Sequence, residues 1–256
     1  MIKIKEFLKD CYTMTSRCLR LSLRNPEMSV MSVVVPIVFL VIFVYLLGGA
    51  MGAEHFGGSY INYVLPGILI MTIGMNAAVT SAIICSDVKQ GILDRFISLP
   101  ISRSSFLVGH VMSSVIRNII STAALIAAAF AMGFRPEANF VQWLGVIGLL
   151  LCFMFIMVWL SVLFGLLVKT IEGANFWSFI QQIFVFISSA LVPTATMPAA
   201  LRYFAEYQPI SPIIDTLRSL FLGGGDARVL ETILWSIGLL AIGYIFSLLA
   251  FKRKMK

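Results

Sequence analysis

Polar side chains recur at helical spacing inside one of the long apolar segments of this chain. Thr72, Asn76 and Thr80 follow one another every four residues within residues 60–86, an uncharged stretch. Because a helix turns once every 3.6 residues, this spacing places the three side chains on one face. Hydroxyl and amide groups on such a face can line a transport path, and they can equally hydrogen-bond to a neighbouring helix. The spacing alone favours neither role.

A second polar stripe lies in residues 175–191, beside a group of phenylalanines. Its polar members are Ser178, Gln182 and Ser189, and the phenylalanines are Phe176, Phe179, Phe184 and Phe186. With Arg117 added, the two stripes give these candidates for lining a path: Thr72, Asn76, Thr80, Arg117, Ser178, Phe179, Gln182 and Phe186. The same choice between a path and helix contacts applies to the second stripe.

Arg117 is the charged residue of another apolar segment, residues 106–132. It stands eleven residues into that segment, roughly 16 Å along a helix that rises about 1.5 Å per residue. An arginine at this depth costs about 2.5–3.5 kcal/mol on insertion scales unless it faces water or snorkels. We expect it either to face a cavity open to the cytoplasm near Asn118, Ser121 and Thr122, or to snorkel from a helix that begins later.

The chain lacks the residue patterns of common catalytic and metal sites. Neither HExxH nor GxSxG occurs, and the spacing of the four cysteines matches no zinc site. No Gly-Lys pair occurs, so the GxxxxGK loop that binds ATP phosphates is missing as well. Proton- and sodium-driven carriers usually place carboxylates inside the membrane, and the apolar segments here hold none. We expect a partner to supply the energy for any uphill transport, although backbone carbonyls can also bind sodium.

The composition is that of a membrane protein. Of the 256 residues, 59% are hydrophobic and 12% are charged, whereas soluble domains carry roughly a quarter charged residues. The net charge of +7 arises from Lys and Arg concentrated near the two ends. The aromatic stacking motifs of proteins that bind RNA or single-stranded DNA are absent. We therefore expect an integral membrane protein that binds no nucleic acid.

Long apolar runs predict six transmembrane helices in one all-α permease domain spanning residues 1–256. Such a helix needs about 20 apolar residues. The expected spans are residues 28–53, 60–86, 106–132, 141–168, 175–191 and 232–251. The six-span core then covers residues 28–251, with a separate helix in residues 1–25 and a basic cytoplasmic tail in residues 252–256.

The distribution of Lys and Arg predicts the orientation. With both termini in the cytoplasm, fourteen of the 19 Lys and Arg residues fall on the inner side and four on the outer side. Cytoplasmic loops of membrane proteins carry just such an excess of positive charge. We expect a multi-pass protein of the plasma (inner) membrane with both termini cytoplasmic.

Two regions are expected to lie along the membrane rather than to cross it. Residues 2–21 have a basic face and an apolar face at helical period, which fits an interfacial amphipathic helix; a helix packed on a soluble partner is the alternative. In the outer connector, residues 193–228, Pro198 and the pair Ser211-Pro212 can open two short apolar helices. These helices either re-enter the outer leaflet or form an amphipathic pair on the surface.

The polar segment at residues 86–109 separates the second and third expected spans and has a helical pattern of its own. Val88, Ile92, Phe96 and Leu99 form a narrow apolar ridge between charged flanks. On the cytoplasmic side, such a ridge is suited to seating a helix in the groove of another protein.

This segment resembles the cytoplasmic loop of type-two ABC exporter permeases, most of all those of daunorubicin-resistance drug exporters. The family pattern is an acidic residue, then Gly-x-Leu-Glu-Arg, then Pro-x-Ser-Arg. The matching residues here are Asp87, Gly91, Leu93, Asp94 (in place of the usual Glu), Arg95, Pro100, Ser102 and Arg103. The Arg24-Asn25-Pro26 corner and the prolines of the outer connector also resemble the family, so the resemblance covers nearly the whole chain.

The resemblance implies a coupling helix that docks in a groove of an ATPase subunit. Its residues would be Asp87, Val88, Gly91, Ile92, Leu93, Asp94, Arg95 and Phe96. It also implies two ABC ATPase subunits, which hold ATP and magnesium, and a second copy of the permease or a paralogue within the membrane lipids. This chain would then be a transporter subunit that binds no cofactor and catalyses no reaction itself.

The substrate is predicted less directly. The family resemblance and the phenylalanines of residues 175–191 favour export of a lipophilic drug or antibiotic. Export of a lipid-linked glycan or polysaccharide is the alternative, although a carbohydrate path should contain more Trp and Tyr. A stand-alone channel or a membrane enzyme is a further alternative from another class.

Overall fold

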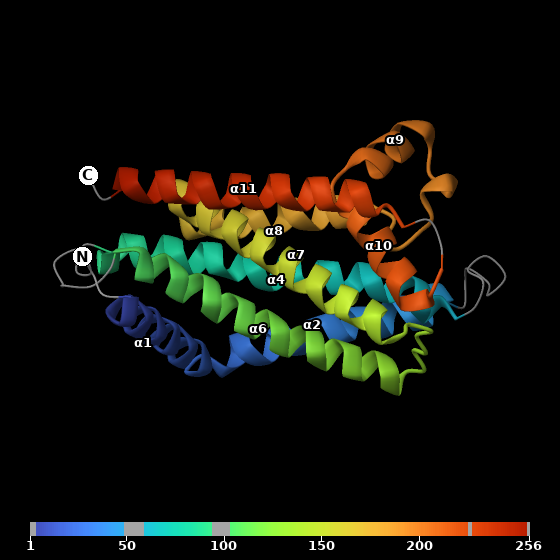
Figure 1. The fold of residues 1–256 in the computed structure, drawn as a ribbon, viewed down its shortest axis with the longest axis horizontal. Helices are drawn as coiled ribbons and strands as arrows, with labels where there is room; N and C mark the ends of the chain where they lie inside the picture. Colours follow the sequence, from blue (N-terminus) through green and yellow to red (C-terminus); the bar gives the residue numbers. More distant parts are fainter. Residues whose placement is uncertain (1–3, 49–58, 94–102, 225–226, 255–256) are drawn as a thin grey trace.

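The computed structural model describes residues 4–48, 59–93, 103–224 and 227–254 (Figure 1). Within these ranges the chain is helical or irregular and contains no strand, which confirms the all-α prediction. In chain order the elements are α1 (Ile4–Leu23), α2 (Pro26–Ile42), the π-helical turn η1 (Phe43–Leu47), α4 (Tyr60–Lys89), α6 (Arg103–Ala131), α7 (Phe140–Leu167), α8 (Ile171–Phe186), the 3-10 turn η3 (Thr194–Thr196), α9 (Ala199–Tyr207), α10 (Ile210–Leu222) and α11 (Val229–Lys254).

Five segments in the described ranges are long and apolar enough to cross a membrane. They are Ser29–Leu46, Tyr60–Lys89, Ser104–Ala131, Phe140–Leu167 and Val229–Lys254. The expected fifth span corresponds to α8, which has 16 residues and therefore extends only about 24 Å. A transmembrane helix needs roughly 20 residues, or about 30 Å, so α8 alone is shorter than a span. The chain is thus an all-helical protein with several membrane helices, while the six-span arrangement is not confirmed.

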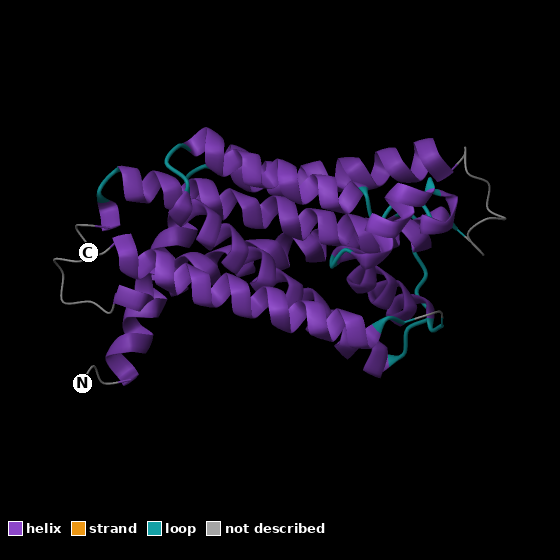
Figure 2. Ribbon diagram, turned by 90° about the horizontal axis from the view of Figure 1, so that it is seen from above, coloured by secondary structure: helices purple, strands orange, loops and turns teal. Residues whose placement is uncertain are grey.

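Helix α4 forms the centre of the bundle, in contact with α2, α6, α7, α8 and α10. Figure 1 shows α4, α6, α7 and α8 running lengthwise through the molecule, with the shorter α10 crossing at the end away from the two termini, and Figure 2 shows the same elongated bundle from above. Glycines permit the closest contacts, because they bring no side chain between the backbones. A Cβ at Gly165 of α7 would lie 2.6 Å from the Ser81 carbonyl oxygen of α4, and one at Gly67 of α4 would lie 2.6 Å from Ala190 Cβ.

The N-terminal helix packs beside the bundle rather than within it. As predicted, the chain turns at Asn25-Pro26, with α1 ending at Leu23 and α2 beginning at Pro26. Cys11, Met14 and Cys18 are buried, and α1 contacts mainly α6. Both chain ends lie at the same end of the bundle (Figure 1), which we call the terminal end.

The outer connector contains two short helices, as predicted, but they have different surroundings. Helix α9 is largely exposed, with Ala205 buried, whereas most of α10 is buried against α4 and α7. Helix α10 begins at Ile210, so that Ser211 lies inside the helix instead of capping it. The Ser211 hydroxyl instead accepts a hydrogen bond from the Ser189 N–H at 3.3 Å. This bond ties α10 to the chain that follows α8.

Arg218 of α10 anchors that helix to the bundle. Its guanidinium donates to the Ser189 carbonyl at 2.6 Å, to the Tyr63 carbonyl at 3.3 Å and to Asp215 Oδ1 at 3.0 Å. It also lies 3.9 Å from the centroid of the Tyr63 ring, within the range of a cation–π contact. The end of the bundle opposite the termini is therefore held by a partly buried network of charged and polar groups.

Candidate functional site

The predicted coupling segment joins α4 to α6 at the terminal end. Helix α4 continues to Lys89 and α6 begins at Arg103, so the connection is shorter than the predicted residues 86–109. Gly91 ends α4 with φ of 65°, a left-handed conformation that favours glycine. Residues 94–102, which include Asp94, Arg95 and Phe96, lie outside the described residues.

Several described residues of this segment pack against the rest of the chain instead of projecting from it. Leu93 is buried in the hydrophobic core, and Val88 packs against that core. Asp87 is also buried, within the last turns of α4. Ile92 is half-buried beside a cavity described below. The coupling role of these residues stays a prediction.

A buried polar cluster joins α1, α4 and α6 at the terminal end. His110 Nε2 of α6 lies 3.2 Å from Asp87 Oδ2 of α4, with the His110 side chain 4% exposed. Its other ring nitrogen, Nδ1, lies 3.9 Å from Cys18 Sγ of α1. A Cβ at Gly109 would lie 2.6 Å from Met14 Cβ, so glycine lets α1 approach α6 closely enough for this contact.

The cluster changes the acidity of the Cys18 thiol. Burial raises the pKa of Cys18, but the hydrogen bond to His110, the charge of His110 and the charge of Arg17 together outweigh burial. The net result is that the pKa of Cys18 lies below its ordinary value. The thiol therefore carries more thiolate than an ordinary cysteine at the same pH.

A cavity of about 320 Å³ lies between these three helices, and we call it the α1–α4–α6 cavity. Its polar lining includes Arg17, Cys18, Thr80, Asp87, His110 and Arg117, and its apolar lining consists of Leu21, Ile83 and Ile92. Arg117 donates from Nη2 to the Thr80 hydroxyl at 3.3 Å. Among the described residues, no carboxylate forms an ion pair with Arg117.

The position of Arg117 can be compared with the two expectations, which were that it faces a cavity open to the cytoplasm or that it snorkels from a helix that begins later. The residue lies fourteen positions after the start of α6 at Arg103, and it borders a cavity at the terminal end. The polar residues that follow it face the bundle instead: Asn118, Ser121 and Thr122 are buried. The Ser121 hydroxyl donates to the Ser32 carbonyl of α2. Whether solvent enters the cavity from the cytoplasm stays a prediction.

The first polar stripe is buried and hydrogen-bonded within the chain. Thr72 donates to the Ile68 carbonyl of its own helix at 2.7 Å. Asn76 Nδ2 donates to the Ser32 carbonyl of α2 at 3.3 Å, and Thr80 donates to the Ser114 hydroxyl of α6 at 2.8 Å. In this structure Asn76 and Thr80 therefore connect helices, and Thr80 also reaches the α1–α4–α6 cavity. A role in lining a transport path stays a prediction.

Phenylalanines beside the second stripe face away from the bundle, whereas Ser189 of the stripe is buried and its hydroxyl donates to Asp215 Oδ1 at 2.7 Å. Phe179 is 63% exposed and Phe186 is 46% exposed, while Ser178 is half-buried. The amide of Gln182 is enclosed, and within the described residues neither its oxygen nor its nitrogen has a hydrogen-bond partner. Another helix or a substrate that packed against α8 would cover this apolar surface, which lies beside the unsatisfied amide.

A second cavity, of about 240 Å³, lies between α7, α8, α10 and α11, and we call it the α7–α8 cavity. Its lining is apolar and aromatic and includes Phe153, Met157, Trp177, Phe184, Ile213 and Leu239. Gln181 also borders the cavity, but its side chain is buried and its amide lies against the Gly74 carbonyl and Trp177 Nε1. Such a lining suits a hydrophobic ligand.

The sequence did not reveal the pairing of Asp87 with His110. The two residues lie 23 positions apart along the chain, and the family pattern that includes Asp87 does not include His110. One signal was available, because the expected topology places both near the cytoplasmic ends of adjacent spans. Among the described residues, no group of three or more His, Cys, Asp or Glu side chains is arranged to hold a metal ion.

Comparison with known proteins decides the family. The family model for the ABC-2 type transporter matches residues 9–222. The chain belongs to the ABC-2 type transporter family. This ABC-2 permease is 26% identical over 208 residues to the daunorubicin resistance ABC transporter permease protein of Streptomyces coeruleorubidus, covering 81% of this chain and 70% of the relative.

A second relative aligns over more of the permease. It is the probable doxorubicin resistance ABC transporter permease protein of Mycobacterium tuberculosis, 26% identical over 255 residues, covering 93% of this chain and 89% of the relative. The resemblance inferred from the loop sequence is therefore confirmed, and the chain is a membrane permease of the ABC transporter class.

Proposed function

We propose that this permease exports a lipophilic drug or antibiotic-like compound. The observation that carries the proposal is the α7–α8 cavity, whose apolar and aromatic walls fit a hydrophobic compound. Two relatives named for resistance to daunorubicin and doxorubicin support the same class of substrate. Trp177 and Phe184 of α8 would provide an aromatic surface for such a ligand.

In this proposal the whole chain is a single permease domain with six spans in the plasma (inner) membrane. Helix α8 is the fifth span, and residues 187–192 complete its path across the bilayer. The terminal end faces the cytoplasm, so that α1 lies in the inner interface and α10 enters the outer leaflet. The excess of Lys and Arg at the terminal end supports this orientation.

Energy comes from a separate ATPase subunit that binds ATP and magnesium. The connection between α4 and α6 docks on that subunit, with Gly91 setting the point where the chain leaves α4. A movement of this connection displaces residues inside the bundle, because Leu93 belongs to the hydrophobic core and Asp87 pairs with His110. Two ATPase subunits serve two permease chains.

The second permease chain, a further copy or a paralogue, covers the exposed face of α8. This face carries Phe176, Phe179, Ile183 and Phe186, each more than a third exposed. The path for the substrate then runs between the two chains, near the second polar stripe.

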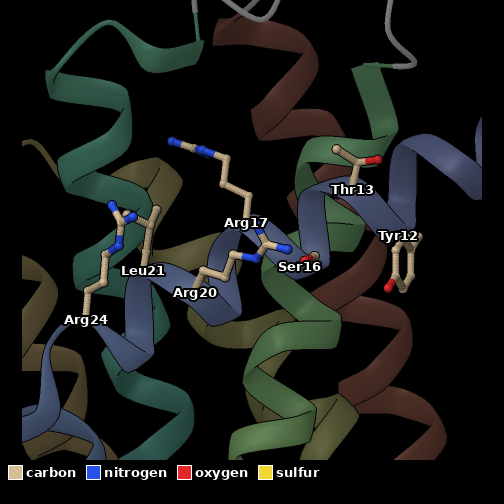
Figure 3. A pocket seen from close by; sticks show the side chains of 7 residues that line it. All are labelled: Tyr12, Thr13, Ser16, Arg17, Arg20, Leu21 and Arg24. Atoms are coloured by element: carbon tan, nitrogen blue, oxygen red, sulfur yellow. The ribbon is translucent and has the colours of Figure 1, made fainter.

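Export of a lipid-linked glycan is a second candidate, because the basic surface of α1 suits the phosphate of such a carrier. Arg17, Arg20 and Arg24 project from one side of this helix around a hollow of about 440 Å³ (Figure 3). The two substrates differ in what they would contact. A lipophilic drug enters the α7–α8 cavity, whereas a glycan carrier is held at its phosphate.

A substrate panel distinguishes the candidates. The permease and the ATPase subunit proposed as its partner are reconstituted in liposomes, and ATP hydrolysis is measured with anthracyclines, other lipophilic cations and lipid-linked glycans. We expect anthracycline-like compounds to stimulate hydrolysis, and Trp177→Ala to change the concentration for half-maximal stimulation. Stimulation by glycan carriers alone would overturn the proposal of drug export, and hydrolysis unaffected by any compound would also count against it.

A further inference from the structure

The α1–α4–α6 cavity is unusual because it is bordered by an arginine that has no carboxylate partner among the described residues. The guanidinium of Arg117 donates a hydrogen bond of 3.3 Å to the Thr80 hydroxyl. The carboxylates of Asp87, Glu206, Asp215 and Glu231 lie against His110, Arg202, Arg218 and Arg228 instead. A guanidinium within a membrane helix costs about 2.5–3.5 kcal/mol unless water or an anion compensates its charge. The site is therefore electrostatically incomplete as it stands.

The charges around the cavity favour an anion. Among the described lining residues, Arg17 and Arg117 contribute two positive charges and Asp87 one negative charge. The Asp87 carboxylate is held by His110 Nε2 at 3.2 Å, on the wall formed by α4 and α6. With Cys18 in its thiol form, the lining therefore has an excess of positive charge whether His110 is neutral or protonated.

We propose that the α1–α4–α6 cavity binds the phosphate group of an anionic ligand, with the guanidinium of Arg117 as its principal donor. A planar guanidinium can donate two parallel hydrogen bonds to phosphate oxygens. The Thr80 hydroxyl already contacts this guanidinium and orients it toward the cavity. The cavity volume of about 320 Å³ lies at the lower end of the range for small-molecule sites, about 300–1,000 Å³.

The apolar part of the lining indicates how such a phosphate would arrive. Leu21, Ile83 and Ile92 line the cavity beside the charged groups, which suits the glycerol and upper acyl chain of a phospholipid. Basic pockets between membrane helices on the cytoplasmic side are known to bind anionic lipid headgroups. A small soluble phosphate ester would use the same donor without the apolar contacts.

The basic hollow of α1 leads toward this cavity. Arg17 and Leu21 line both spaces, and Arg20 and Arg24 lie further along the same side of the helix (Figure 3). An anion attracted to this side of α1 therefore meets Arg17 before it reaches Arg117. The site rests on the proposed placement of the terminal end at the inner leaflet, but it does not depend on transport of any substrate.

Binding is measured on the purified, delipidated full-length permease by native mass spectrometry. One arm adds phosphatidylglycerol, a second adds diacylglycerol, which lacks phosphate, and a third adds glycerol phosphate, which lacks acyl chains. We expect phosphatidylglycerol to be retained and diacylglycerol not to be. Binding of glycerol phosphate alone would keep the phosphate site and assign it to a soluble ester. Failure of both phosphate compounds to bind would overturn the proposal.

Variants locate the site. Arg117→Gln should weaken retention of the phosphate compound by roughly tenfold or more, since a hydrogen bond to a charged group is lost. Arg117→Lys keeps the charge but cannot donate two parallel hydrogen bonds, so its binding should fall between that of the wild type and that of Arg117→Gln, which separates loss of charge from loss of fold. Arg253→Gln is the matched control, because Arg253 is exposed at the terminal end of α11 and lines neither space. Equal retention by Arg117→Gln and the control would refute the assignment.

A measurement on the unaltered protein guards against misfolded variants. Phosphatidylglycerol with a photoreactive group near its headgroup is activated after binding, and the labelled peptides are identified. Labels on α1 and on the terminal halves of α4 and α6 are expected, near Leu21 and Ile83. Labels confined to α9 and α11 would place the lipid elsewhere and would contradict the proposal.

Discussion

The substitution Gly165→Ala tests the closest contact between the two central helices. A Cβ at this position of α7 would lie 2.6 Å from the carbonyl oxygen and 2.9 Å from the Cα of Ser81 in α4. Both are backbone atoms, so no change of rotamer relieves the overlap and the helices must move apart. Overpacking of this kind costs typically about 1–3 kcal/mol. The Ser81 hydroxyl also donates to the Ala174 carbonyl at 2.9 Å, so the displacement would disturb α8 as well.

Gly148→Ala is the matched control, because it adds the same methyl group to the same helix. No atom lies within 4 Å of a Cβ built at Gly148, and alanine is a better helix former than glycine. Each kcal/mol lowers the melting temperature of a chain of this size by roughly 2–4 °C. Thermal unfolding in detergent should therefore show Gly165→Ala lowered by about 2–12 °C and Gly148→Ala unchanged or raised. Equal melting temperatures for Gly165→Ala and the wild type would refute the reasoning.

Three further predictions concern the terminal end. Gly91→Pro and, separately, Asp94→Lys should leave membrane insertion intact but uncouple ATP hydrolysis from transport, and full transport by both variants would argue against a docking role for this segment. His110→Ala leaves the Asp87 carboxylate buried without its partner. We expect this substitution to destabilise the protein by about 3–5 kcal/mol, measured by thermal unfolding. A change below about 1 kcal/mol would contradict the buried pair. In a permease with Cys18 as its single cysteine, the same His110→Ala change should raise the pKa of the thiol and shift the pH profile of alkylation to higher pH; an unshifted profile would exclude the contact.

Hydropathy and local signals predicted most of the helical framework. The run at residues 141–168 became α7, Phe140–Leu167, and the Asn25-Pro26 corner separates α1 from α2 as expected. These features depend on composition and on the backbone restrictions of proline, which act locally. They can be read without knowing which helices touch.

The misplaced boundaries have tertiary causes. Polar residues from Ser86 onward suggested a loop, yet α4 continues because Asp87 finds a buried partner in His110. Helix α8 ends early at a serine pair, where the Ser188 hydroxyl donates to the Val185 carbonyl and accepts from the Ala190 N–H. Serine hydroxyls that bond to the nearby backbone compete with the helical pattern in this way.

The candidate site was predictable only in part. The spacing of Thr72, Asn76 and Thr80 indicated one polar face, but their partners are residues of α2 and α6 that no local pattern identifies. Arg117 was recognised by its depth alone. The cavity beside it exists because α1 packs on α6, next to α4, an arrangement set by contacts such as Met14 with Gly109.

Transport into inverted membrane vesicles tests the central claim most directly. Vesicles carrying this permease and the ATPase subunit proposed as its partner are given a fluorescent anthracycline on the outside, which corresponds to the cytoplasmic face. We predict accumulation that requires ATP, the ATPase and the permease together, and that is absent when the ATPase cannot hydrolyse ATP. Accumulation by the permease without the ATPase, or none in the complete system, would contradict an ATP-driven exporter of lipophilic compounds.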